Sequence, residues 1–158
     1  MKNLRTIAVC VSITLYSLNS SAQTGDVIPL NEPNLNKPKL FQNLPDNIPV
    51  RMDNIISLFG IGVGQQVSMS MSDVTPFQFE GNVVSAVSKY ENSIQSVVVK
   101  STNYPGARFT ISKITDENGN ISYRGRILSM QHGDMYELKG DNNQFILIKR
   151  KFYDLVNE

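Results

Sequence analysis

His132 and Asp134 come nearer than any other residues of this sequence to a recognisable chemical pair. His132 is the only histidine in the chain, and Asp134 follows it two positions later, in the stretch SMQHGDMYEL. A histidine oriented by an aspartate can act as a general base, and the same side chains can bind a metal ion. A base also needs a nucleophile and an oxyanion site close by, whereas a zinc site needs two or three further strong ligands.

The number of metal ligands that the chain can provide decides whether His132 is a functional residue or part of a turn. Only carboxylates could complete a metal site, because the chain has one histidine and its single cysteine lies near the N-terminus. The stretches before Gln131 and after Asp134 both have the character of strands, and Gly133 would supply the positive φ of a tight two-residue connection. We therefore expect His132-Gly133 to form a turn. We expect no catalytic, cofactor-binding or metal-binding residues.

Residues 1–22 have the anatomy of a secretory signal peptide. They begin with basic side chains, continue with a mostly apolar run over 6–18, and end in Ser20 and Ala22, small residues of the kind that precede a cleavage site. The apolar run of about 13 residues is shorter than the roughly 20 that a membrane-spanning helix needs. We expect an exported protein, periplasmic or secreted, with no transmembrane segment once the signal is removed. Lipid attachment at Cys10 is the alternative, disfavoured by its place within the apolar run.

Removal of residues 1–22 also changes the composition of the protein, which limits the classes of function that it can have. It takes away Cys10, so no disulfide and no thiol nucleophile remain. It leaves 13 basic and 14 acidic side chains, a net charge near −1, which does not favour nucleic acid as a partner. We expect the partner to be a protein or a glycan of the envelope or the extracellular space.

The segment 23–49 is expected to be a Pro/Asn-rich extended arm, followed by a single β domain over 50–158. It holds five of the seven prolines, which lack an N–H donor and restrict the preceding residue. Its first half has little apolar surface to offset the entropy of ordering. We expect a disordered start and an end that docks through Leu40, Phe41 and Leu44. The alternative is a flexible tether.

A short helix is predicted over residues 53–59, with Asp53 as its N-cap and a glycine just past its end. Its apolar stripe would consist of Ile55, Ile56 and Phe59. The GIGVG run that follows comes after a helix and before a strand, which reverses the order of the dinucleotide-binding fingerprint. We interpret this run as a glycine-rich connector.

From residue 65 onward the pattern is that of β-strands. Val67, Met69 and Met71 alternate with serines, as in a half-buried strand. A phase shift in the next strand suggests a β-bulge near Gly81. Turn signals recur about every 10 to 15 residues and leave no room for crossover helices. The sequence predicts a mainly β fold: an antiparallel meander of about seven strands that forms a rolled sheet or small barrel, with one short N-terminal helix.

Cations gather in the last third of the chain, where they form either a basic patch for an anionic partner or an ordinary solvated edge. They are Arg124, Arg126, Lys149, Arg150 and Lys151. Asp134, Glu137 and Asp154 lie near them in the sequence, and mixed charges near neutrality are usual for protein surfaces. We expect the solvated edge.

The C-terminal half has an aromatic residue, Tyr123, two positions before Gly125, then a turn and a short strand, and then the run NNQFILIKR. In these features residues 77–155 resemble the propeptide-type β domain that precedes the catalytic domain of secreted zinc metalloproteases. The chain departs from that family because it has no H-E-x-x-H sequence and no cysteine in this region to occupy a zinc ion. The resemblance implies a stand-alone module shaped like a protease-binding prosegment and assigns no catalytic residue.

Three classes of function remain. The leading one is a secreted, non-enzymatic binding module, because the side chains of common catalysis are missing. The second, implied by the resemblance, is a protease inhibitor or prosegment-like protein. The third is a carboxylate-based hydrolase that uses Asp134 and Glu137, which we hold lowest because both look like surface charges near a turn.

Overall fold

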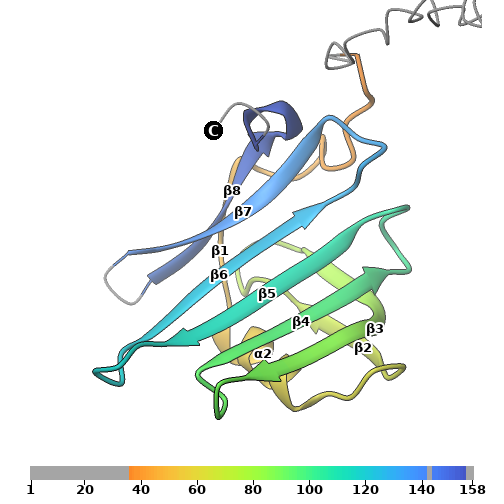
Figure 1. Ribbon diagram of the computed structural model, residues 1–158. Coiled ribbons are helices and arrows are strands. Elements are labelled where there is room, and N and C mark those ends of the chain that lie inside the picture. The colour runs from red at the N-terminus through yellow and green to blue at the C-terminus, as the bar shows by residue number, and fades with distance from the viewer. Residues whose placement is uncertain (1–35, 142–143, 156–158) are drawn as a thin grey trace, which may run out of the picture. The chain divides into compact units, whose positions relative to one another are not determined.

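The computed structural model describes residues 36–141 and 144–155, which form one antiparallel sheet and a short helix (Figure 1). The strands are β1 (Asn47–Pro49), β2 (Gln66–Ser70), β3 (Gln78–Lys89), β4 (Ile94–Ser101), β5 (Arg108–Thr115), β6 (Ile121–Leu128), β7 (Asp134–Asp141) and β8 (Gln144–Lys151). The helical elements are α2 (Met52–Ser57) and the 3-10 turns η1 (Leu58–Gly60) and η2 (Phe152–Leu155). None of the helices in this part of the chain has the length and apolar character needed to span a membrane. The predicted signal peptide and the start of the arm lie outside the described residues.

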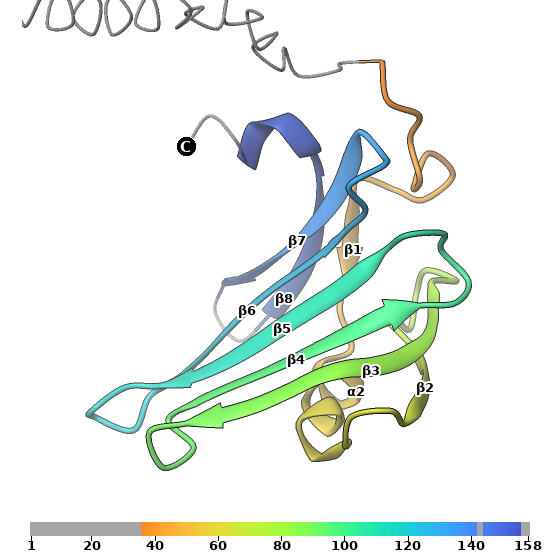
Figure 2. The ribbon, with the colours of Figure 1, turned by 45° about the vertical axis from the view of Figure 1, so that its right-hand side comes forward.

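The strand order in the sheet is β1-β8-β7-β6-β5-β4-β3-β2. Strands β2 to β7 each pair with the next strand along the chain, and the sheet curls into a half-barrel (Figure 2). The predicted mainly β meander with one short helix is therefore confirmed. The eighth strand, β1, comes from the segment predicted as an arm and pairs with the outer edge of β8. Its Pro49 is compatible with a strand because β1 is an edge strand.

Helix α2 lies between the two edge strands. The backbone N–H of Arg51 donates to the carbonyl of Met71 (3.0 Å), and the side chain of Asn54 donates to the carbonyl of Ser70 (2.9 Å). The predicted N-cap was wrong: Arg51 occupies that position without a side-chain cap, and Asp53 lies in the first turn. The hydrogen bond from Arg51 to Met71, the residue after β2, fixes the start of the helix, which begins at Met52 and not after Asp53.

The apolar stripe of this helix also differs from the prediction. Ile55 and Leu58 are buried, Phe59 is partly buried, and Ile56 is 42% exposed. Leu58 lies three positions after Ile55 and so falls on the same face of the helix, whereas Ile56 points to another side.

The core fills the concave side of the sheet. Val67, Met69 and Met71 are buried there, as predicted. Phe41 from the arm sits among aromatic rings, with its centroid 5.1 Å from that of Tyr136 and 5.4 Å from that of Tyr104. Leu40 and Leu44 pack against the same cluster. The docked end of the arm is thereby confirmed for the described residues 36–49.

The predicted bulge is present in β3, slightly later than expected. The register with β4 shifts between Val83 and Ser85, so the extra residue is Val84, whose side chain is exposed. Gly81 serves another purpose, because a Cβ there would lie 2.3 Å from the carbonyl oxygen of Lys100. A side chain at this position would push β4 away from β3.

The turn between β5 and β6 contains the Asn118-Gly119 pair. Gly119 has a φ of +82°, and the Asp116 carboxylate accepts the backbone N–H groups of Asn118 (2.9 Å) and Asn120 (2.8 Å). The side-chain amide of Asn120 also donates to Asp116, and this bond is the main reason that the pKa of Asp116 lies below its ordinary value. These local contacts hold the hairpin that presents the outer face of β5 and β6.

Candidate functional site

His132 lies in the five-residue loop between β6 and β7. Its Nδ1 is 2.8 Å from the hydroxyl of Ser129, and its backbone N–H donates to the Ser129 carbonyl (3.1 Å). The turn prediction is confirmed, although the connection is longer than the predicted two residues. Asp134, which would have to orient the ring of a general base, instead accepts hydrogen bonds from the backbone of the arm.

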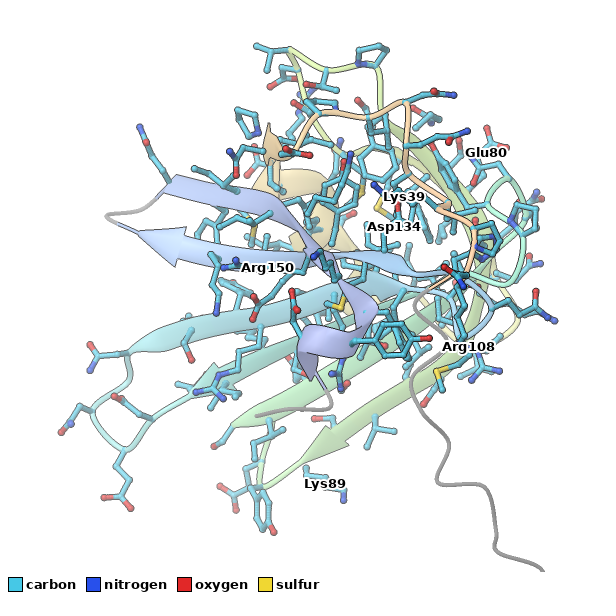
Figure 3. The ribbon with its side chains drawn as sticks, turned by 90° about the horizontal axis from the view of Figure 1, so that it is seen from above. Lys39, Glu80, Lys89, Arg108, Asp134 and Arg150 are labelled. Carbon is cyan, nitrogen blue, oxygen red and sulfur yellow. The ribbon has the colours of Figure 1, made fainter. Side chains whose placement is uncertain are left out.

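Asp134 clamps the arm to the sheet (Figure 3). Its two carboxylate oxygens accept the backbone N–H groups of Leu40 (2.6 Å) and Phe41 (2.9 Å), and its exposure is only 3%. The expectation that Asp134 is a surface charge was therefore wrong. Next to it, the Tyr136 hydroxyl donates to the carbonyl of Pro45 (2.5 Å). Burial, and then the charge of Asp134, raise the pKa of Tyr136 well above its ordinary value.

Gly133 is a glycine for a different reason from the one predicted. Its φ does not lie in the left-handed region, which Gly64, Gly106 and Gly119 adopt among the glycines that the structure describes. Instead the arm passes directly over it: the Gly133 N–H donates to the Pro38 carbonyl (3.0 Å), and a Cβ would lie 3.0 Å from the Lys37 carbonyl oxygen. The position demands close approach of two backbones.

We expect Gly133→Val to lower the free energy of unfolding by about 1–3 kcal/mol, because it overpacks the contact with the arm. His132→Asn should leave the fold and any binding activity unchanged, since asparagine can also hydrogen-bond locally. Thermal and urea unfolding of both variants, beside a binding assay, measure these effects. A stable Gly133→Val protein together with an inactive His132→Asn protein would contradict the structural role of this loop.

The carboxylate pair of the hydrolase hypothesis is not brought together. Asp134 and Glu137 are three positions apart on β7, so their side chains leave opposite faces of the sheet. Asp134 points to the arm, whereas Glu137 lies on the outer face beside Lys139 and Arg150. Two carboxylates on opposite faces cannot flank one bond of a substrate. Among residues 36–141 and 144–155, no three histidine, cysteine or acidic side chains are placed to hold a metal ion.

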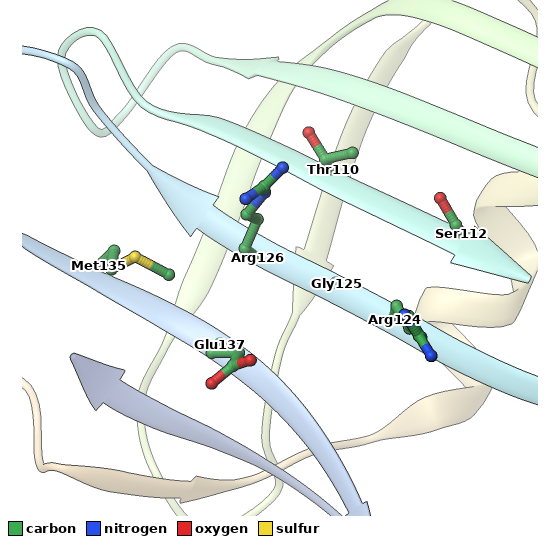
Figure 4. Close-up of a pocket in the computed structure, with 7 residues that line it drawn as sticks. All are labelled: Thr110, Ser112, Arg124, Gly125, Arg126, Met135 and Glu137. Atoms are coloured by element: carbon green, nitrogen blue, oxygen red, sulfur yellow. The ribbon is translucent and has the colours of Figure 1, made fainter. Parts of the chain in front are cut away.

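A hollow of about 160 Å³ lies on the outer face of the sheet, over β5, β6 and β7 (Figure 4). Its lining consists of Thr110, Ser112, Arg124, Gly125, Arg126, Met135 and Glu137. Strand register explains this grouping, because Arg126 lies opposite Thr110 on one side and Glu137 on the other. Arg124 in turn lies opposite Ser112. The hollow therefore joins two guanidinium groups and two hydroxyl groups on one face.

The charges around the hollow are not balanced. Glu137 forms ion pairs with Lys139 (2.8 Å) and Arg150 (3.7 Å). Arg124 and Arg126 have no ion pair and no hydrogen bond from their side chains to any residue that the structure describes. Each therefore keeps its full set of N–H donors for solvent or a ligand.

The five cations singled out in the sequence do not form one patch. Arg124, Arg126 and Arg150 share the outer face, but strand alternation turns Lys149 inward. The Lys149 ammonium group donates to the Leu44 carbonyl and lies 3.4 Å from the Asp46 carboxylate, so it belongs to the arm contact. Lys151 is two positions after Lys149 on β8, so it faces the same side of the sheet.

Sequence reasoning also missed cations of the outer face, among them Lys100 and Arg108. Lys100 and Arg108 lie directly opposite each other on β4 and β5, and both are exposed. Arg108 has the same alternation as Thr110, so it extends the basic face beyond the hollow. The alternation along β5 could have predicted that Arg108 lies on the outer face. The position of Lys100 beside it depends on the register between β4 and β5.

A second hollow, of about 440 Å³, lies where β1 and β8 meet the start of α2. Its lining consists of Pro49, Val50, Met52, Gln144, Phe145 and Ile146. It contains no charged side chain, so it offers an apolar surface without evident chemistry.

No protein-family model, curated protein or solved structure matches this chain. The resemblance to metalloprotease propeptides thus stays a prediction. The outer-face hollow is the candidate functional site, because polar side chains from three strands line it and its two cations have no ion pair among the described residues.

Proposed function

We propose that this protein is an exported, non-enzymatic binding module, and that the outer face of β5, β6 and β7 binds a negatively charged partner in the envelope or the extracellular space. One observation carries the proposal: Arg124 and Arg126 stand side by side at a hollow without an ionic partner among the described residues. Paired guanidinium groups attract and orient anionic groups.

The arrangement of charge favours a binding role over that of a solvated edge. The Cα atoms of residues two apart on a strand lie about 7 Å from each other, so Arg124 and Arg126 place two like charges on the same stretch of the outer face. An ordinary surface intersperses charges of both signs. Here Glu137, the carboxylate at the hollow, is already shared between Lys139 and Arg150. An anionic partner would relieve the repulsion between the two arginines.

The non-enzymatic part of the proposal is supported by the groups that could have done chemistry. His132 is bonded to Ser129 in a loop, and Asp134 and Tyr136 are bonded to the backbone of the arm. Each of these groups has a structural contact that accounts for its position. The candidate site itself contains no histidine and no pair of carboxylates.

The test measures which components of the envelope fraction of the producing cell are captured by the immobilised protein. The wild-type protein, the Arg124→Glu/Arg126→Glu variant and a Lys89→Glu control are used side by side. Lys89 is an exposed cation at the far end of β3, so its reversal changes net charge without touching the hollow. We expect the wild type and the control to retain a common component that the double variant loses by at least about tenfold. Equal retention by all three proteins would refute the proposal.

A further inference from the structure

We propose that the hollow between Arg124 and Arg126 holds a single tetrahedral dianion, the phosphate or sulfate group of a ligand. This inference rests on the proposed function, because it assigns the chemistry of the group that the partner presents to the same face. It can be tested on the purified protein without knowledge of the partner.

The charge of the site matches a dianion. Arg124 and Arg126 contribute two positive charges that no described carboxylate pairs with. A phosphate monoester carries about −1.5 to −2 near neutral pH, so it neutralises both guanidinium groups at once. A carboxylate carries a single charge and would leave one guanidinium group uncompensated.

The donors around the hollow come from two neighbouring strands, β5 and β6. The two guanidinium groups project from β6 on either side of Gly125 (Figure 4), and each presents N–H donors in a planar fork. The half-buried Thr110 lies opposite Arg126 on β5, and its hydroxyl has no hydrogen bond to any described residue. A planar carboxylate has two oxygens, which one fork satisfies, whereas a tetrahedral anion has oxygens for all three donors.

The Ser112 hydroxyl is a weaker contributor, since it already donates to the Ser96 hydroxyl (3.1 Å) on β4. Glu137 opposes an anion, although its ion pairs with Lys139 and Arg150 reduce its charge. The hollow thus offers an anion three donor groups, and the one carboxylate that opposes binding is partly neutralised.

The shape of the hollow suits a small head group. Gly125 contributes only backbone to its floor, because packing against Ile111 on the inner side leaves no room for a Cβ, which would lie 2.9 Å from the Ile111 side chain. Met135, fully buried, adds an apolar wall. The volume of about 160 Å³ accommodates one oxyanion, while the open outer side leaves room for the rest of the ligand.

The experiment measures binding of four probes by amide chemical shifts of the isotope-labelled protein. The probes are inorganic phosphate, glycerol 1-phosphate, sulfate and acetate. We expect phosphate and sulfate to produce saturable shifts centred on residues 110–112, 124–126 and 135–137, with acetate at least about tenfold weaker. The affinity for glycerol 1-phosphate should fall as the pH is lowered through about 6, where a phosphate monoester gains a proton, whereas the affinity for sulfate should not. Tighter binding of glycerol 1-phosphate than of phosphate identifies an ester as the preferred source; the reverse identifies the free ion.

Variants locate the site and separate fork geometry from charge. Arg126→Gln should weaken phosphate binding at least about tenfold, and Arg126→Lys should fall between this variant and the wild type because it keeps charge without the fork. Glu137→Gln should tighten binding by removing the opposing charge. Lys89→Gln is the matched control and should bind as the wild type does. Thermal unfolding of each variant verifies that these substitutions leave the fold intact.

Two results would overturn the inference: acetate binding as well as phosphate, or phosphate binding that Arg126→Gln leaves unchanged. Its failure is distinguishable from that of the proposed function. If the arginine reversal abolishes envelope capture but phosphate and sulfate do not bind the hollow, the face binds a partner of other chemistry and only this inference fails. If phosphate binds the hollow but capture does not depend on the arginines, this inference stands and the proposed function fails.

Discussion

Replacing Phe41 with alanine should lower the free energy of unfolding by about 3–5 kcal/mol. The Phe41 side chain is 1% exposed and contacts the rings of Phe77, Tyr104 and Tyr136, with centroids 5.1 to 6.3 Å apart. Its removal exchanges these contacts for a cavity in the middle of the half-barrel. Urea unfolding followed by circular dichroism measures the change.

The control is Leu40→Ala, the neighbouring apolar residue of the arm, which is only partly buried. It should cost clearly less than Phe41→Ala because part of its surface already meets water. A Phe41→Ala protein within about 1 kcal/mol of the wild type would contradict the view that the arm completes the core. The expected result means that residues near 41 cannot be trimmed from the domain as a dispensable linker.

Replacing Asp134 with alanine should cost about 3 kcal/mol, because it leaves the N–H groups of Leu40 and Phe41 without an acceptor. The bond to Phe41 is buried, so water cannot readily replace the carboxylate there. Hydrogen exchange at these two amides should also accelerate relative to amides of the central strands. Urea unfolding and exchange measured by nuclear magnetic resonance report the two effects separately.

Glu137→Ala is the matched control for Asp134→Ala. Glu137 is a carboxylate of the same strand, but it faces outward and forms partly exposed ion pairs with Lys139 and Arg150. Its removal should change stability by less than about 1 kcal/mol. Equal losses for the two variants would show that Asp134 acts as an ordinary surface charge. Because Asp134 and Phe41 are in contact, their double variant should lose less than the sum of the single losses.

The candidate site could be predicted from the sequence only in part. The alternation along β6 places Arg124 and Arg126 on one face, and this much is readable from two residues and a period of two. Thr110 and Glu137 join them only through the register of three strands. Register depends on loop lengths, and the five-residue loop after β6 is longer than its Gly133 suggested.

By itself the sequence determined the mainly β character, the order of the seven meander strands and several of the turns. These features depend on local alternation and on turn residues such as Gly119, which act over a few positions. Only the tertiary structure decided that residues 47–49 form an edge strand and that Asp134 clamps the arm. Leu40 and Asp134 are 94 positions apart, and no local pattern encodes which distant backbone a carboxylate will meet. Such pairings arise when the sheet curls and brings the arm across its concave side.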